Sequence, residues 1–433
     1  MTSEIKTRLA QIRTGEIPQG YKKTKLGIIP QEWEVMSLKS RFDRLTRKNS
    51  EGNTNVMTIS AQYGLINQEE FFKKEIASED KSNYYLLHNG EFAYNKSYSS
   101  GYPFGAIKRL SLYDKGIVSP LYICFSANNN NSCPEFYQHY FESGKLNSEI
   151  QAIAQEGARN HGLLNISVED FFYTKIIVPP LEEQKKIAAI LSAQDRIIEL
   201  CERKIEQLKR MKKYYLQNMF PKDGEEYPEI RFKGFTDPWE QRKLSEIYAS
   251  IGNAFVGTAT PYYVDSGHFY LESNNVKDGQ INRNTEIFIN DDFYEKQKDK
   301  WLHTGDMVMV QSGHVGHAAV IPEELDNLAA HALIMFRNPK VKIYPYFLNY
   351  QYQTIKTQKK IENITTGNTI KHILASDMQD FVVDVPSFDE QEIIGDYFLN
   401  LDHLITLHQR KCEEEKKKKK ALQQLLLTGI IRV

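Results

Sequence analysis

The chain lacks the features that mark several common protein classes. No Cys-x-x-Cys pair and no Cys/His ligand spacing surrounds its four cysteines, so neither a disulfide framework nor a zinc site is indicated. The first residues contain no apolar stretch typical of a signal peptide. The least charged stretch, residues 116–134, contains Pro120 and four consecutive asparagines, which excludes a membrane span there. We therefore expect a cytoplasmic protein without a membrane partner.

A strong net charge is also missing. The 55 Lys and Arg residues are balanced by 56 Asp and Glu residues, which gives a formal net charge of -1. Because phosphate binding normally requires a positive surface, this balance disfavours DNA binding unless the basic residues are segregated. The hydrophobic content of 41% is ample for folded cores, and 433 residues are enough for about two to four structural units.

The signatures of enzymes that act on DNA are absent from the sequence. It contains no Asn-Pro-Pro-aromatic motif of amino-methyltransferases and no glycine-rich loop after a predicted strand. Gly144 and Lys145 are followed by Leu146, where a phosphate-binding loop requires Ser or Thr. A stand-alone methyltransferase or nuclease is therefore disfavoured, and we expect the chain itself to be non-catalytic.

What the sequence does contain is an internal repeat. The segment VPPLEEQ at 178–184 matches VPSFDEQ at 385–391, at an offset of 207 residues. A second match surrounds Trp33 and Trp239, at an offset of 206. Two separate matches with nearly equal offsets indicate a domain duplication, because the period is far too long for a solenoid.

Between these anchors the two halves diverge but keep the same order of features. The run 92–97 corresponds to 307–312, and the run 121–125 corresponds to 332–336; all four are predicted to be strands. We expect an α+β protein with two similar globular domains, each followed by a long helix. The expected boundaries are an N-terminal helical segment at 1–25, globular domains at 26–178 and 221–385, and long helices at 179–220 and 386–433.

Each predicted long helix carries a seven-residue apolar repeat. With Ile187 assigned to position a, seven of the ten a and d positions up to Asn218 are apolar, which is typical of two helices that pair as an antiparallel coiled coil. A helix of about 38 residues would be about 57 Å long, or about 17 base pairs of DNA. A spacer and a plain dimerisation coil remain equally open. The run Lys416–Lys420 follows three glutamates and is expected to form ion pairs between residues four positions apart on a solvated face.

Four segments together carry a family resemblance. They are LGIIPQEWEV around Trp33, ISAQYGLI from Ile59, FAYNKSYSSGYPFGAIKRL from Phe92, and the helix start PLEEQKKIAAILSAQD. These segments resemble the specificity subunit of type I restriction–modification systems, and the resemblance covers nearly the whole chain.

The resemblance implies a non-catalytic DNA-recognition subunit. In that family two target recognition domains each bind one half of a bipartite double-stranded DNA sequence. The two helical regions pair with pseudo-two-fold symmetry, set the gap between the half-sites and dock two methyltransferase subunits, and motor-nuclease subunits then join. No cofactor is expected in this chain; S-adenosylmethionine, ATP and Mg are expected on the partner subunits. The alternative is a duplicated coiled-coil scaffold that binds other proteins.

Polar side chains that can read base edges or hold phosphates form three clusters in each half. In the first half they are Ser60, Gln62 and Tyr63; Tyr94, Asn95, Lys96, Ser97 and Tyr98; and Arg159, Asn160 and His161. In the second half they are Ser273, Asn274 and Asn275; Gln311, Ser312, His314 and His317; and Asn368, Thr369, Lys371 and His372. Each residue alone fits an ordinary turn equally well, but the recurrence predicts DNA contacts.

Three further interpretations concern the repeated residues. His314 and His317 have no third ligand nearby, so we expect no metal site. Trp33 and Trp239 are expected to be core residues. The repeated acidic and amide residues at the helix starts fit helix capping, but their faithful repetition also predicts a partner-binding role for Glu182, Glu183, Gln184, Glu390 and Gln391.

Overall fold

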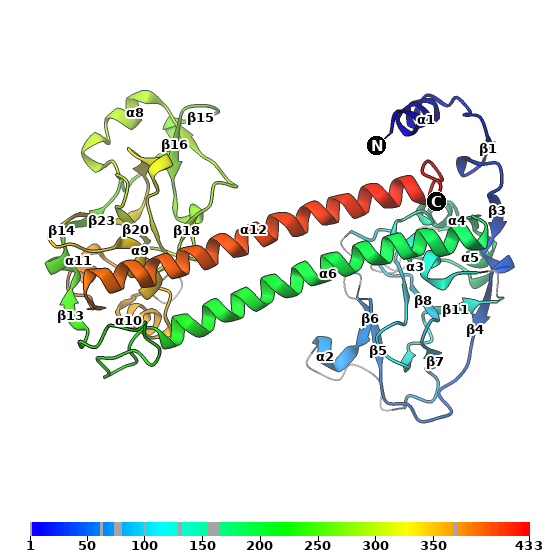
Figure 1. Ribbon diagram of the computed structural model, residues 1–433, viewed down its shortest axis with the longest axis horizontal. Coiled ribbons are helices and arrows are strands. Elements are labelled where there is room, and N and C mark those ends of the chain that lie inside the picture. The colour runs from blue at the N-terminus through cyan, green and yellow to red at the C-terminus, as the bar shows by residue number, and fades with distance from the viewer. Residues whose placement is uncertain are drawn as a thin grey trace. The chain divides into compact units, whose positions relative to one another are not determined.

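The computed structural model describes residues 2–60, 64–72, 80–98, 101–128, 132–154, 164–367 and 371–433. The chain forms two compact units. Unit 1 contains the described residues up to Cys201 together with Lys411–Val433, and unit 2 is Glu202–Arg410. The division falls inside the two long helices, so each unit holds one globular domain, the start of one long helix and the end of the other (Figure 1).

The globular domain of unit 1 is built on a four-stranded antiparallel sheet in the order β4-β11-β8-β9. Its strands are β4 (Phe42–Leu45), β8 (Phe92–Asn95), β9 (Ala106–Arg109) and β11 (Ile123–Ala127). Phe42, Phe92 and Phe125 are buried on one side of this sheet and meet Phe141 of α3 (Pro134–Glu142) with ring centroids 5.7–5.9 Å apart. Each such aromatic pair contributes about 0.5–1.5 kcal/mol beyond its buried area.

Unit 2 repeats this sheet in the order β14-β23-β20-β21. Its strands are β14 (Tyr248–Asn253), β20 (Met307–Val310), β21 (Ala318–Val320) and β23 (Leu333–Pro339). The central strand β20 is apolar throughout and fully buried, as expected for a strand covered on both faces. The prediction that 92–97 and 307–312 contain equivalent strands, as do 121–125 and 332–336, is confirmed, because β8 and β20 hold the same place in their sheets and so do β11 and β23.

A two-stranded ladder connects each of the two repeated tryptophans, Trp33 and Trp239, to a long helix. In unit 1, β3 (Glu34–Ser37) follows Trp33 and pairs with β12 (Lys175–Val178), directly before the helix. In unit 2, β13 (Glu240–Lys243) follows Trp239 and pairs with β24 (Val382–Val385). Both tryptophans are buried in the core of their unit, as predicted.

The remaining elements surround these frames. In unit 1 they are α1 (Ser3–Thr14), β1 (Tyr21–Thr24), β2 (Gly27–Pro30), β5 (Met57–Ser60), β6 (Gly64–Asn67), α2 (Gln68–Phe72), β7 (Tyr85–His88), β10 (Lys115–Val118), α4 (Asn147–Ile153) and α5 (Val168–Tyr173). In unit 2 they are α7 (Leu244–Ile247), β15 (Tyr263–Val264), β16 (His268–Leu271), β17 (Val276–Lys277), β18 (Gln280–Ile281), β19 (Phe288–Ile289), α8 (Asp291–Glu295), β22 (Ala329–Ala330), α9 (Pro345–Gln351), α10 (Ile355–Ile364) and α11 (Ala375–Gln379). The helical part of the N-terminal segment ends earlier than expected, because Gly15 with φ of 82° closes α1.

The long helices are α6 (Leu181–Asn218) and α12 (Phe388–Leu426). Their apolar repeat has the predicted period, but the buried stripe differs from the expected one. Ile187, Leu191 and Cys201 are buried, whereas Ile190 and Ile197 at the expected d positions are more than a third exposed. The seam therefore uses positions a and e of the predicted register. The apolar stripe is wide enough for either choice, and the contacts of the globular domain decide which side is covered.

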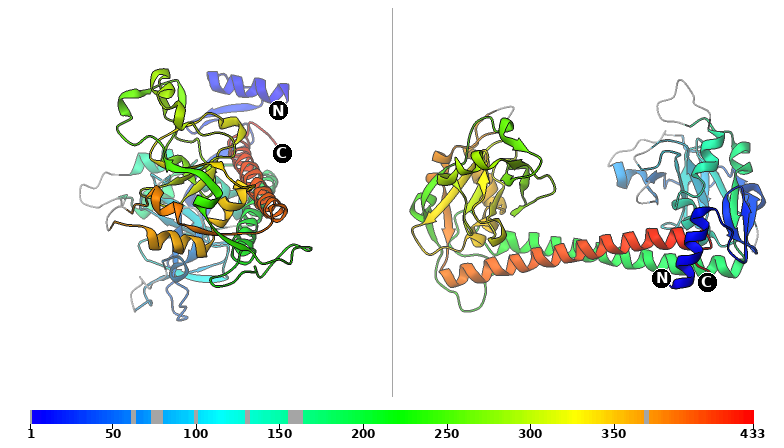
Figure 2. Two further views of the ribbon diagram at one scale, coloured as in Figure 1. Left: turned by 90° about the vertical axis from the view of Figure 1, so that its left-hand side faces the viewer. Right: turned by 90° about the horizontal axis from the view of Figure 1, so that it is seen from above.

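Within each unit the first half of one long helix lies against the last half of the other. In unit 1, Asp195 pairs with Lys419 and Gln194 donates to Glu415; the ribbons of the two helices are seen in Figure 2, right. In unit 2, Lys212 pairs with Asp402, at 2.7 Å. Lys416 and Lys418 pair with glutamates as expected, but these lie three residues earlier and not four; Lys419 instead pairs with Asp195 and is largely covered, so the expectation is wrong for it.

Both long helices carry many charged side chains. Among the described residues, no helix combines the length and the apolar character that crossing a membrane requires.

Candidate nucleic-acid interface

The repeated glutamine at each helix start anchors the globular domain to the helix. In unit 1 the Gln184 carboxamide accepts a hydrogen bond from the backbone N–H of Cys133 at 3.0 Å and donates one to the carbonyl of Pro179 at 2.8 Å. In unit 2 Gln391 accepts from the N–H of Tyr344 at 2.9 Å and donates to Pro386 at 2.9 Å. Cys133 and Tyr344 directly precede α3 and α9. The same amide therefore joins equivalent elements in both units.

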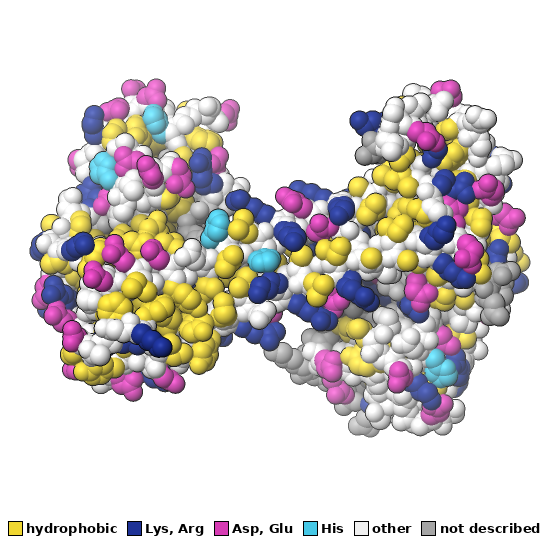
Figure 3. Space-filling view, in the orientation of Figure 1, with side chains coloured by type: hydrophobic (Ala, Val, Ile, Leu, Met, Phe, Trp, Pro, Cys, Tyr) yellow, Lys and Arg dark blue, Asp and Glu magenta, His cyan; other side chains and the backbone are white. Residues whose placement is uncertain are grey.

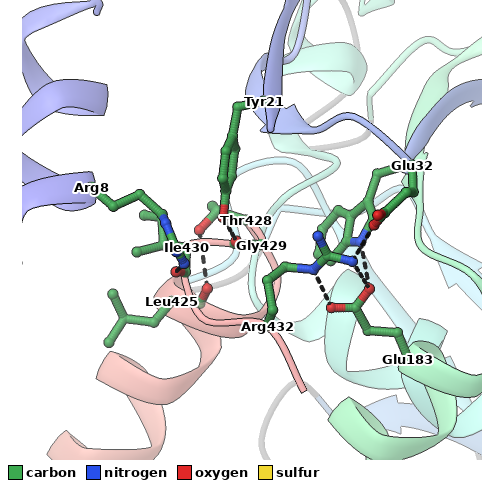
Figure 4. Close-up of polar contacts among 10 residues, drawn as sticks. Arg8, Tyr21, Glu32, Glu183, Leu425, Thr428, Gly429, Ile430 and Arg432 are labelled. Carbon is green, nitrogen blue, oxygen red and sulfur yellow. Dashed lines mark hydrogen bonds and ion pairs between the residues drawn. The ribbon is translucent and has the colours of Figure 1, made fainter. Parts of the chain in front are cut away.

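The repeated glutamate beside each glutamine is held by an arginine. Arg432 forms a two-pronged ion pair with Glu183, at 2.7 and 3.0 Å, and also contacts Glu32 (Figure 4). Arg231 forms the same pair with Glu390, with both distances 2.8 Å. Each arginine lies in the segment that follows one long helix, and each glutamate lies at the start of the other.

The surroundings of the two glutamates differ in one respect. The indole N–H of Trp33 donates to Glu183 at 2.8 Å. The indole nitrogen of Trp239 is buried without a hydrogen-bond partner in the described part of the chain. In unit 2 the Nη2 of Arg231 also donates to the backbone carbonyl of Asp237, at 2.7 Å.

These contacts correct the partner-binding prediction for four residues. Glu183, Gln184, Glu390 and Gln391 are all nearly inaccessible and are occupied inside their own unit. Their faithful repetition reflects domain attachment, because a buried carboxylate or amide that loses its partner is costly. Glu182 is the exception: its side chain is exposed and pairs with Lys185 on the same helix.

In unit 1 the cluster after β8 is divided between core and surface. Tyr94 is buried, stacks on Phe171 and donates to the carbonyl of Phe104, so the prediction that it contacts DNA is wrong. Burial also raises the pKa of Tyr94. Lys96 donates to the carbonyl of Ile166, whereas Tyr98 is 61% exposed. Asn95 accepts from the N–H of Ser97, which is an ordinary turn contact.

The cluster after β20 in unit 2 lies beside a second predicted cluster. Ser312 forms an antiparallel bridge with His372, and the N–H of Gly313 donates to the carbonyl of Lys371 at 3.1 Å. Unit 1 shows the same juxtaposition, because the N–H of Leu164 donates to the carbonyl of Lys96 at 3.0 Å. In both units the loop after the equivalent sheet strand therefore meets the segment that leads into α5 or α11.

The unit 2 loops border an open hollow of about 420 Å³. His314 and His317 line it with Lys371, whose ammonium pairs with Glu362 at 2.8 Å. Burial lowers the pKa of His317; the Asp278 carboxylate opposes the effect and the nearby His314 adds to it. Near neutral pH the His317 ring is therefore uncharged and can donate or accept a hydrogen bond. The Gln311 side chain is buried, and the backbone carbonyl of Gln311 accepts from the N–H of Ile373.

Sequence reasoning missed the contribution of α10 to this hollow. Gln358 and Lys359 of α10, together with Gln353 just before it, also line the hollow. Their signal was weak, because the corresponding helix of unit 1, α4, has a different sequence and the repeat therefore does not point to them. The two adjacent lysines Lys359 and Lys360 in an amphipathic helix were the one available hint.

The third pair of clusters is only partly a surface feature. Asn275 is buried; it accepts from the N–H of Glu272 and donates to the carbonyls of Asn282 and Thr285, so its predicted DNA contact is wrong. Asn274 is exposed and Ser273 half-buried. In unit 1, Ser60 ends β5. The predicted residues Gln62, Tyr63, Arg159, Asn160, His161, Asn368 and Thr369 lie outside the described residues.

The ring centroids of His314 and His317 are 6.2 Å apart. Within the described ranges, no group of three or more His, Cys, Asp or Glu side chains is placed to hold a metal ion.

Comparison with known proteins defines the class of this fold. Residues 30–210 and 236–416 each match the type I restriction modification DNA specificity domain. The putative type I restriction enzyme MjaX specificity subunit of Methanocaldococcus jannaschii is 26% identical, with 96% of this chain and 97% of that protein covered.

Two solved structures show the same fold at lower sequence identity. A chain from a type I R-M system has a TM-score of 0.54 at 16% identity and covers 93% of this chain and 99% of its own. The type I restriction–modification system S subunit from M. genitalium has a TM-score of 0.54 at 13% identity and covers 91% and 96%.

The duplicated sheet and helix start thus coincide with two copies of one DNA specificity domain. The two matched segments together span most of the chain. The chain belongs to the type I restriction–modification DNA specificity family, and its function is that of the DNA-recognition subunit.

The ion pair between Arg231 and Glu390 in unit 2 leads to a stability prediction. Arg231→Met leaves the Glu390 carboxylate, whose side chain is 1% exposed, without its counter-ion. We expect a loss of about 3–5 kcal/mol in the free energy of unfolding of unit 2, measured by urea denaturation. The control is Arg242→Met, which removes an exposed pair with Glu240 and should cost less than about 1 kcal/mol. Equal losses in the two variants would contradict a stabilising role for the Arg231–Glu390 pair.

Proposed function

We propose that each globular domain reads one half of a bipartite double-stranded DNA target, and that the chain itself carries no catalytic activity. The observation that supports this most directly is the recurrence of one frame with different loops. Both units share the four-stranded sheet, the two-stranded ladder after the tryptophan and the buried glutamine at the helix start. The loops after β8 and β20 present different side chains. A shared frame holds the loops in equivalent places, and differing side chains allow different bases to be read.

In unit 2 the hollow beside α10 offers both kinds of DNA contact. Lys359 and Lys371 are exposed cations suited to phosphates, and Gln353, Gln358 and His314 have the donors and acceptors that read base edges. The near-zero net charge of the chain is compatible with this arrangement, because the phosphate contacts need only a local positive surface.

We propose further that α6 and α12 pair as an antiparallel coiled coil that sets the gap between the half-sites. In unit 2 the residue numbers of contacting pairs rise on one helix as they fall on the other: Lys212 meets Asp402, and Tyr215 contacts Tyr397. This trend supports an antiparallel arrangement. A helix of 38 residues has a length of about 57 Å.

The outer face of this coil is proposed to dock two methyltransferase subunits, to which motor-nuclease subunits are added. Ile197 and Leu200 in unit 1 are 39% and 58% exposed, and Leu404 and Leu407, their equivalents at an offset of 207, are 42% and 45% exposed. Apolar side chains also interrupt the charged surface of the helices in Figure 3. Two equivalent apolar stripes suit two copies of one partner. S-adenosylmethionine, ATP and Mg would be bound by the partners.

The two-reader proposal predicts an asymmetric result from a domain exchange. Replacing residues 245–375, which hold the variable loops of unit 2, by the corresponding segment of another family member should change one half of the methylated sequence and leave the other half unchanged. Sequencing of methylated sites in cells that carry the chimera and its partners provides the measurement. A change in both halves, or in neither, would rule out the assignment of one reader to each unit.

The coiled-coil proposal predicts the effect of lengthening both helices together. Seven residues inserted after Arg203 and seven after Gln409, in the existing register, add about 10.5 Å to an antiparallel pair. The gap in the methylated target should grow by up to about three base pairs. Insertion into α6 alone should abolish methylation, because the two seams no longer match. An unchanged gap in the double insertion would contradict the spacer role.

The docking proposal predicts a change in subunit stoichiometry. Leu404→Glu with Leu407→Glu places two charges in one apolar stripe, and we expect methyltransferase binding at that stripe to weaken more than about tenfold. Native mass spectrometry should then show one methyltransferase per chain in place of two. Gln409→Glu adds a charge at a neighbouring exposed position and should leave the stoichiometry unchanged. Retention of two subunits in the double variant would contradict the docking site.

A further inference from the structure

A carboxylate inside each long helix meets a lysine of the other long helix. Asp402 of α12 accepts two contacts from the ammonium of Lys212, at 2.7 and 2.8 Å. Asp195 of α6, its equivalent at an offset of 207, pairs with Lys419 of α12. The two lysines are also separated by 207 residues, so the pair is duplicated together with the helices.

The globular domain adds a third member to each pair, and here the two units differ. In unit 2 the hydroxyl of Tyr350, on α9, donates to Asp402 at 2.8 Å, and the Lys212 ammonium lies 5.1 Å from the centre of the ring. In unit 1 the equivalent residue is His139, since it follows Pro134 of α3 by five positions as Tyr350 follows Pro345 of α9. Each triad joins one globular domain to both long helices.

The contacts of His139 are less complete than those of Tyr350. Its Nε2 lies 3.0 Å from the hydroxyl of Ser192. Its Nδ1 lies 3.7 Å from Asp195, which is longer than a hydrogen bond, and has no hydrogen-bond partner within the described part of the chain. The ring is nearly inaccessible, with 3% of the side chain exposed, whereas Asp195 is 38% exposed.

The charges around His139 decide what its protonation would do. Lys419 already neutralises Asp195. On α3 itself Glu135 is paired with Arg109 and Glu142 with Lys108, both from β9. Every carboxylate that faces the ring therefore has a cation, and an imidazolium would be an additional buried charge. Burial lowers the pKa of His139, although Asp195 and Glu142 oppose the effect. Tyr350 of unit 2 stays neutral at neutral and weakly acidic pH, because tyrosine normally titrates at about pH 10.

We propose that Asp195 and Asp402 are positioning residues that attach each DNA-reading domain to the two long helices, and that protonation of His139 loosens this attachment in unit 1 alone. This inference rests on the proposed function, because it takes the two globular domains to be the two readers. As the pH falls, unit 1 releases its half-site before unit 2 releases the other half-site.

The direction of the pH effect follows from linkage. A histidine whose pKa is lower in the attached state than the usual value of about 6.5 binds its proton more readily when released. Its contribution to attachment is therefore complete above about pH 6.5 and declines as the pH falls below that value. The window of the effect is weakly acidic, where the tyrosine triad of unit 2 does not titrate.

Hydrogen exchange on the full-length chain tests the attachment without DNA. After correction for the intrinsic pH dependence, backbone amides of 134–142 should exchange roughly three- to tenfold faster at pH 5.5 than at pH 7.5, whereas those of 345–351 should not change. His139→Tyr copies unit 2 and should remove the pH dependence of α3. Tyr350→His copies unit 1 and should create it in α9. Asp195→Asn and Asp402→Asn should each speed exchange only in its own unit, and at both pH values.

Footprinting of the full-length chain with its methyltransferase partner, on its methylated target, supplies the second readout. Protection of one half-site should weaken at pH 5.5 in the original chain and be restored by His139→Tyr. Equal pH dependence of both half-sites, or pH dependence that survives His139→Tyr, would overturn the inference. Absence of half-site protection at every pH, with the exchange results as expected, would instead count against the two-reader function and leave the attachment role in place.

Discussion

The carboxamides of Gln184 and Gln391 are the contacts on which both units depend. Each is buried at the first turn of a long helix, accepts from the backbone at the start of α3 or α9, and donates back to the proline-containing segment before the helix. Because the interior offers no water to replace a lost partner, such an amide enforces one arrangement of three segments. The neighbouring glutamate and its arginine then bring in the segment that follows the opposite helix.

This attachment explains how one frame serves two different readers. The anchoring glutamines lie far along the chain from the loops after β8 and β20. The loops can therefore vary without disturbing the contacts that hold the domain to its helix. The same separation leaves the outward stripes of α6 and α12 free, because the buried seam uses the other side of the apolar repeat. The loops and the exposed apolar stripes therefore belong to different elements of each unit.

The duplication is not complete in its chemistry. Trp33 donates to a glutamate and Trp239 does not, and His139 stands where the other unit has Tyr350. Both differences occur at buried polar contacts, where a single hydrogen bond or proton changes the balance of charge. Units with the same topology can for that reason respond differently to the same change in conditions.

The sequence by itself determined the duplication, the equivalent strands of the two halves, the long helices and the family. Each of these is recorded in local spacing or in the match between the halves. It also identified both tryptophans as core residues. Tertiary structure decided what spacing cannot express. Tyr94 and Asn275 have the composition of contact residues but point into their own unit, and Ile190 and Leu191 are equally apolar although only Leu191 is covered. Glu183 and Gln184 repeat faithfully for attachment and not for partner contact. Phe171 covers Tyr94 and Arg432 holds Glu183, so the side that such a side chain faces is settled only when these separate segments meet.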